Sequence, residues 1–199
     1  TQVSDPVVTF DPQSASTEAW RNFWGANLHT YSSFVSFMTG TGVTRTKPVE
    51  QKLQDPEVLS SSFMTNANNF HNIYDNYQFP DHIRVVQVAG WGSPTVKAVN
   101  YKNYHGYPSY ETLFTIEGDR AVVYPSAVSS TADETYFFNL SLFNKDQSQD
   151  AQHRNLLSST PVQDIVKDVI EADSIPEINY VSTTKPPLTE ADTKLMVST

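Results

Sequence analysis

The chain has 199 residues, of which 38% are hydrophobic and 12% aromatic, so it can form one medium-sized domain with a sizeable core. Thirteen Lys and Arg residues against 22 Asp and Glu residues give a net charge of −9, which disfavours nucleic acids and anionic membrane surfaces as partners. The absence of cysteine excludes disulfides, thiolate catalysis and cysteine-based metal sites.

The first part of the chain has the pattern of aromatic-rich helices. Residues 1–16 are punctuated by Asp, Ser and Pro and are expected to be irregular. Large apolar residues then recur at spacings of three and four over residues 18–38, which predicts a helix that ends at Gly40. Residues 41–56 are polar and indicate a loop, and residues 57–77 indicate one or two short helices.

The pattern changes after Pro80, where short runs rich in β-branched and aromatic residues predict strands. These runs are 84–89, 98–101, 110–116 and 135–142. Residues 162–170 form a compact amphipathic pattern with Pro161 at its start, which predicts a helix.

Three segments follow from these patterns. Residues 1–79 are predicted to form a helical, aromatic-rich segment, and residues 80–173 an α/β core of strands and helices. Residues 174–199 begin with a Pro-, Thr- and Ser-rich stretch and are predicted to be a linker or tail that leads to a downstream segment.

An acid and a histidine follow two of the predicted strands. Asp119 lies just past strand 110–116, and His153 lies beyond strand 135–142. In a parallel sheet both side chains would lie at the same carboxyl edge. They are therefore expected within hydrogen-bond distance of each other, with strands 84–89 and 110–116 parallel. An acid that orients a histidine is the supporting half of a nucleophilic triad. The alternative is that Gly118-Asp119 is only a turn and that His153 caps a helix.

Motifs for metals and nucleotides are missing from the sequence. No His-x-x-x-His pair is present, and Gly90-Trp91-Gly92 lacks the later glycine of a dinucleotide-binding loop. Neither a metal nor a cofactor is therefore expected.

Three sequence blocks resemble the C-terminal half of α/β-hydrolases. They are residues 86–95 (VQVAGWGSPT), 118–127 (GDRAVVYPSA) and 151–157 (AQHRNLL). The nearest branch is the lipase/acyltransferase group that includes lecithin–cholesterol acyltransferase and the PGAP-type esterases. The resemblance implies the C-terminal half of an α/β-hydrolase sheet, with Asp119 as the acid and His153 as the base of a Ser-His-Asp triad.

The resemblance also implies that the helices within residues 17–77 form a cap over an acyl pocket. Six aromatic residues would then contribute to the cap and to an acyl-binding surface, while ordinary core packing is an equal alternative for any one of them. These residues are Trp20, Phe23, Trp24, Tyr31, Phe34 and Phe37.

The sequence departs from the family pattern in two respects. The glycine and the threonine or valine that follow the acid in the family are Arg120 and Ala121 here, which puts the local turn geometry in question. The Gly-x-Ser-x-Gly motif that carries the nucleophile occurs nowhere in these 199 residues.

Three functional hypotheses are compatible with these observations. In the first, the chain is the C-terminal portion of a serine esterase or lipase. Its partner is the N-terminal portion of the same hydrolase, which carries the nucleophile and oxyanion hole as a separate chain or a cleaved segment. Its substrate is an ester or lipid, and its location is extracellular or periplasmic rather than cytoplasmic.

In the second, the chain is a non-catalytic extracellular or viral binding or structural module. In the third, it is a small α+β pocket enzyme in which strands 110–116 and 135–142 pair antiparallel.

Overall fold

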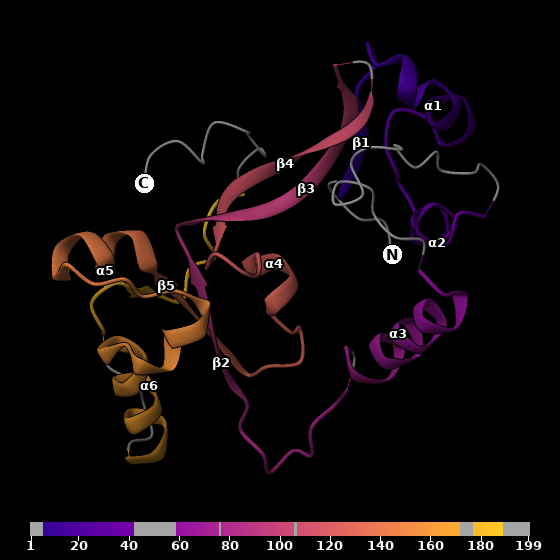
Figure 1. Ribbon diagram of the computed structural model, residues 1–199. Helices are drawn as coiled ribbons and strands as arrows, with labels where there is room; N and C mark the ends of the chain where they lie inside the picture. Colours follow the sequence, from indigo (N-terminus) through magenta and orange to yellow (C-terminus); the bar gives the residue numbers. More distant parts are fainter. Residues whose placement is uncertain (1–5, 42–58, 76, 106, 172–176, 189–199) are drawn as a thin grey trace. The chain divides into compact units, whose positions relative to one another are not determined.

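The computed structural model describes residues 6–41, 59–75, 77–105, 107–171 and 177–188 (Figure 1). The chain divides into two compact units, each considered by itself below. The first comprises Thr1–Ile73 and Lys97–Leu113, and the second comprises Tyr74–Val96 and Phe114–Thr199.

The first unit combines short helices with a small sheet. Its helical elements are η1 (Ala15–Thr17), α1 (Glu18–Trp24), α2 (Tyr31–Thr39) and most of α3 (Ser61–Tyr74). The sheet has the strand order β1-β3-β4, with β1 at Val8–Phe10, β3 at Ser93–Tyr104 and β4 at Tyr107–Gly118. β1 runs parallel to β3, in a register that pairs Val8 with Val99 and Phe10 with Tyr101.

Aromatic rings form the core of this unit. Phe10, Trp20, Phe37 and Tyr101 are all buried. The Phe37 ring centroid lies 5.6 Å from those of Phe10 and Trp20, and 5.3 Å from that of Tyr101. These tilted and edge-to-face contacts join β1, α1, α2 and β3 into one cluster.

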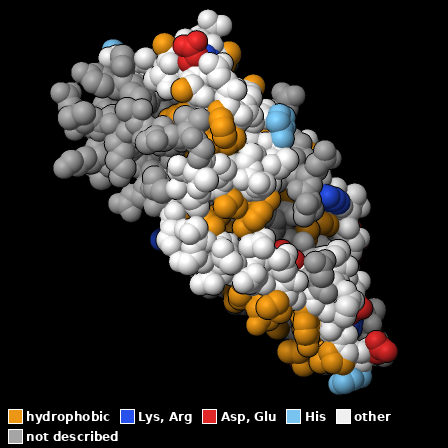
Figure 2. Space-filling model, turned by 90° about the vertical axis from the view of Figure 1, so that its right-hand side faces the viewer, with side chains coloured by type: hydrophobic (Ala, Val, Ile, Leu, Met, Phe, Trp, Pro, Cys, Tyr) orange, Lys and Arg blue, Asp and Glu red, His pale blue; other side chains and the backbone are white. Residues whose placement is uncertain are grey.

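Helix α3 is much less covered. Met64 is its buried residue, while the large side chains of Phe63, Phe70 and Ile73 are exposed. Figure 2 shows that hydrophobic side chains also reach the surface at several other places on the face it presents.

The second unit is built on a parallel strand pair. β2 (Val86–Trp91) pairs with β5 (Glu134–Asn139) over six residues, and β6 (Val181–Ser182) pairs antiparallel with β5. The helical elements are α4 (Tyr124–Ala127), α5 (Leu140–Gln147), η2 (His153–Ser158) and α6 (Thr160–Glu171).

Helices cover both faces of this pair. Adjacent residues of a strand point to opposite faces, and Phe137 and Phe138 of β5 belong to separate buried clusters. Phe137 packs with Ala89 and with Tyr124 of α4. Phe138 packs with residues of α5 and α6, among them Val162. Burial on both faces is typical of parallel strands.

Several predictions from the sequence agree with the structure. The mixed α/β content is confirmed, since both units contain helices and strands. Strand 84–89 largely corresponds to β2, helix 162–170 lies within α6, and the helical pattern of 57–77 contains α3. The single helix predicted over 18–38 is two helices, because Gly25 has φ 86° and ends α1.

The predicted strand lengths need correction. Strand 98–101 is only the middle of the 12-residue β3, and strand 135–142 ends at Asn139. The Asn139 side chain accepts a hydrogen bond from the Leu142 amide and so starts α5 directly after the strand. The segment 1–16, predicted to be irregular, contains β1.

The predicted strand pairing and segment limits also differ from the structure. The prediction that strands 84–89 and 110–116 run parallel in one sheet is wrong, because β2 pairs with β5 and β4 belongs to the other sheet. Residues 97–113 group with the first unit, since β3 pairs there with β1. In the predicted linker or tail 174–199, residues 177–188 are described and include β6, while 174–176 and 189–199 lie outside the described residues.

Substitution of Gly118 tests the packing at the end of β4. A Cβ atom there would lie 2.4 Å from the Val122 carbonyl oxygen and 2.6 Å from Thr95 Oγ1. Gly118→Ala is expected to lower the free energy of unfolding by about 2–3 kcal/mol, because neither neighbour is a flexible side-chain end. His82→Ala, at an exposed position of the same unit, is the control and is expected to change the free energy of unfolding by less than about 0.5 kcal/mol. Equal losses in urea unfolding would contradict this account.

Candidate active site

The acid and the histidine meet at the carboxyl end of the parallel pair β2/β5. After β2 the chain runs out along β3 and back along β4, and a β-bridge then joins Ser93 and Asp119. A Cβ built on Gly90 would lie 3.0 Å from the Asp119 Cβ, so the acid sits against the end of β2. His153 follows β5 and α5 and begins η2. The two side chains therefore share one sheet edge, as predicted, although β2 and not β4 provides the first strand.

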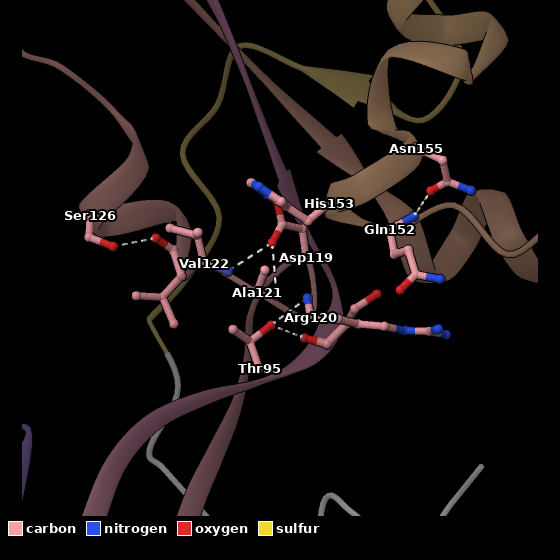
Figure 3. Close-up of polar contacts among 11 residues, drawn as sticks. Thr95, Asp119, Arg120, Ala121, Val122, Ser126, Gln152, His153 and Asn155 are labelled. Atoms are coloured by element: carbon pink, nitrogen blue, oxygen red, sulfur yellow. Dashed lines mark hydrogen bonds and ion pairs between the residues drawn. The ribbon is translucent and has the colours of Figure 1, made fainter. Parts of the chain in front are cut away.

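Asp119 and His153 make two direct contacts (Figure 3). His153 Nδ1 lies 2.9 Å from Asp119 Oδ2, and the His153 backbone N–H donates to the Asp119 carbonyl at 2.9 Å. The Asp119 side chain is 8% exposed and that of His153 is 55% exposed. The predicted hydrogen-bond contact is confirmed, and it joins a buried acid to an accessible imidazole.

The other carboxylate oxygen of Asp119 is held by its own turn. Oδ1 accepts the backbone N–H groups of Ala121 at 3.1 Å and Val122 at 2.9 Å. The Asp119 N–H donates in return to the Val122 carbonyl at 3.2 Å. These two donors occupy Oδ1 and leave Oδ2 for the histidine.

Arg120 occupies a position that favours glycine. Its φ is 80°, in the left-handed region that side chains other than glycine rarely adopt. Its guanidinium Nη1 lies 2.8 Å from Asp150 Oδ1, and the two side chains are 39% and 61% exposed. Asp150 Oδ2 also accepts from the Gln152 side chain at 3.0 Å. Arg120 therefore connects the turn of the acid to the segment that carries the histidine.

The segment before His153 is held by reciprocal hydrogen bonds. The Gln152 backbone N–H donates to Asn155 Oδ1 at 2.7 Å, and Asn155 Nδ2 donates to the Asp150 backbone carbonyl at 3.0 Å. Ala151 exchanges two hydrogen bonds with the Asn144 side chain, at 2.7 and 2.9 Å. These contacts fix the backbone on which the imidazole is mounted.

The hydrogen-bond pattern assigns the protons of the dyad. An ionised carboxylate only accepts, so Nδ1 of neutral His153 carries the proton and Nε2 has the free lone pair. Within the described part of the chain, no hydrogen bond engages Nε2. The site can therefore take a proton from a nucleophile and stabilise the imidazolium that results.

The six aromatic residues predicted to bind substrate all belong to the first unit. Trp20 and Phe37 are buried in its core, which agrees with the alternative of ordinary packing. Trp24 and Phe34 are partly buried against that core, and Phe23 and Tyr31 are exposed. A role in acyl binding stays a prediction for all six.

The described residues contain neither a cluster of metal ligands nor a membrane-spanning helix. Among residues 6–41, 59–75, 77–105, 107–171 and 177–188, no group of three His, Cys, Asp or Glu residues could hold a metal ion. None of the helices in these ranges is long and apolar enough to cross a membrane.

Three further residues of the site have no signal of their own in the sequence. Thr95, Asp150 and Asn155 act through the turn and the backbone segment around the dyad. Thr95 lies in the block 86–95 and Asn155 in the block 151–157, whereas Asp150 lies outside all three sequence blocks.

No protein-family model, curated protein or solved structure matches the chain. Function must therefore be inferred from the geometry of the site.

The proton assignment of the dyad can be tested by ¹⁵N NMR of the imidazole rings. At a pH where the ring is neutral, His153 is expected to carry its proton on Nδ1. Asp119→Ala removes the acceptor and is expected to move the proton to Nε2, the tautomer that a solvated side chain favours. The exposed His82 serves as the internal control. A wild-type His153 protonated on Nε2 would contradict the assignment.

Replacing Arg120 separates backbone strain from the ion pair. Both Arg120→Ala and Arg120→Gly lose the exposed contact with Asp150, which is worth at most about 1 kcal/mol. Only glycine also relieves the positive φ, so Arg120→Gly is expected to be about 1 kcal/mol more stable than Arg120→Ala in urea unfolding. An alanine variant as stable as the glycine variant would show that the turn is not strained.

Proposed function

We propose that the chain is the C-terminal portion of an α/β-hydrolase and supplies the acid and the base of a Ser-His-Asp triad for ester hydrolysis or acyl transfer. The observation that carries this proposal is the 2.9 Å contact between His153 Nδ1 and the buried Asp119 carboxylate. The order of acid before histidine, both at the carboxyl edge of parallel strands, agrees with it.

In this mechanism His153 moves the protons. Nε2 accepts the hydroxyl proton of a serine as the serine oxygen attacks the ester carbonyl, and it then donates that proton to the leaving alcohol. Asp119 holds the imidazole in the required orientation and stabilises its charged form. The two turn amides on Oδ1 keep the carboxylate in place while this charge appears and disappears.

The serine is proposed to come from outside these 199 residues, because the sequence has no Gly-x-Ser-x-Gly motif. The edge of β2 supports this. Among the described strands β2 pairs only with β5, although helices cover both faces of the pair. Parallel sheets with covered faces usually contain more strands, and an open edge is a site for strand addition.

A parallel strand added at β2 would have its carboxyl end at the same edge as the dyad. That is where a nucleophile must lie to reach His153 Nε2. The proposed partner is therefore the N-terminal portion of the hydrolase, either as a cleaved segment or as a separate chain.

The other two hypotheses receive less support. A non-catalytic module has no need for a buried carboxylate aligned with an accessible imidazole. The small pocket enzyme requires antiparallel pairing of strands 110–116 and 135–142, and the described β4 and β5 belong to different sheets.

Ester hydrolysis by the complete protein, including its proposed nucleophile segment, tests the proposal. With p-nitrophenyl butyrate as the substrate, His153→Ala is expected to lower kcat at least about 10⁴-fold and Asp119→Ala about 10³- to 10⁴-fold. The matched control is His82→Ala, which removes an exposed histidine of the same unit and is expected to leave kcat unchanged.

The 199-residue chain alone is expected to hydrolyse this ester no faster than His153→Ala does, because it lacks the nucleophile. Full activity of His153→Ala in the complete protein would overturn the assignment. So would full activity of the isolated chain.

A further inference from the structure

Thr95 is connected to the catalytic acid by hydrogen bonds although it lies 24 residues earlier in the chain. It lies in β3, and its side chain is completely buried. Its hydroxyl donates to the Ser93 carbonyl at 2.9 Å and accepts the Arg120 N–H at 2.8 Å (Figure 3). Both the donor and an acceptor site of this hydroxyl are therefore used within the fold.

The Arg120 amide is the first of three consecutive N–H groups that define the turn of the acid. The next two, from Ala121 and Val122, hold Asp119 Oδ1. By fixing the first amide, Thr95 fixes the peptide plane between Asp119 and Arg120 and supports the φ of 80° at Arg120. A residue with this φ needs support from its surroundings.

Thr95 also sets the packing immediately before the acid. A Cβ on Gly118 would lie 2.6 Å from Thr95 Oγ1 and 2.8 Å from Thr95 Cβ, so the end of β4 lies directly against this side chain. The Thr95 side chain therefore lies beside Gly118, and its hydroxyl binds the Arg120 N–H on the other side of Asp119.

We infer that Thr95 is a positioning residue of the dyad: its hydroxyl holds the Asp119 turn so that Oδ2 meets His153 Nδ1. The catalytic part of this inference rests on the proposed hydrolase function, whereas the structural part does not. Removing the hydroxyl is expected to free the Arg120 amide, to loosen the two bonds to Oδ1 and to weaken the orientation of His153.

The structural part is tested on the chain itself. Thr95→Val keeps the shape of the side chain and removes the hydroxyl, and Thr95→Ser keeps the hydroxyl. The ¹⁵N spectrum of His153 is expected to show a mixture of Nδ1–H and Nε2–H forms in Thr95→Val and the wild-type Nδ1–H form in Thr95→Ser. The control is Thr17→Val, which removes a buried hydroxyl of the first unit and is expected to leave His153 unchanged.

The catalytic part is tested by kinetics of the complete protein. Thr95→Val is expected to lower kcat about tenfold or more with little change in KM, as for the loss of one hydrogen bond that acts on the transition state, and Thr95→Ser is expected to restore it. If Thr95 had only a structural role, Thr95→Val would lower the amount of folded protein. It would then neither lower kcat at an unchanged KM in the folded fraction nor change the His153 tautomer.

The outcomes are distinguishable. If Thr95→Val leaves both the His153 tautomer and kcat as in Thr17→Val, the inference is overturned. If the tautomer changes but the wild-type complete protein hydrolyses no ester, the proposed function fails and the positioning role of Thr95 stands. If Thr95→Val does not fold, hydrogen exchange in the wild-type chain decides: a protected Arg120 amide supports the inference, and an unprotected one refutes it.

Discussion

The buried carboxylate of Asp119 is the constraint on which the rest of the site depends. A buried charge is costly unless hydrogen bonds surround it. Here two turn amides bind one oxygen and the His153 imidazole binds the other. Each neighbouring feature serves this arrangement. Gly118 leaves room for the Val122 carbonyl, Arg120 takes a left-handed conformation so that the following amides point back to the acid, and Thr95 holds the first amide of the turn. The acid is thus positioned before any substrate or nucleophile is present, which is the property that a triad requires.

The topology of the second unit explains how distant segments reach one edge. β2 and β5 run parallel, and the long excursion through β3 and β4 returns the chain to the end of β2, where Asp119 lies. Two parallel strands must be joined by a crossover connection. Helix α4 lies within the connection from β2 to β5 and covers one face of these two strands. His153 follows β5 and α5 in the chain. The ion pair between Arg120 and Asp150 connects its segment to the turn that contains Asp119. Helices cover both faces, and β2 is an edge strand among the described strands, so the proposed partner strand could pair there, next to the dyad.

The sequence predicted local features well and non-local features poorly. Asp119 and His153 could be found because the motifs that contain them are contiguous, and β2 and α6 because each has an unbroken apolar or amphipathic pattern. The strand partners could not be predicted, since pairing β2 with β5 depends on residues almost fifty positions apart. β1 has only three residues and gains its stability from β3. Helical spacing also could not distinguish buried Trp20 and Phe37 from exposed Phe23 and Tyr31, because all four recur at similar intervals.

The most direct test of the central claim is the structure of the complete protein, in which one distance decides. The account predicts that the hydroxyl oxygen of a serine outside these 199 residues lies about 2.6–3.2 Å from His153 Nε2, with some loosening in the absence of substrate. The same structure should keep His153 Nδ1 in contact with the Asp119 carboxylate. If the nearest serine hydroxyl lies beyond the reach of a hydrogen bond, even one relayed by a water molecule, Asp119 and His153 are not the acid and base of a serine hydrolase.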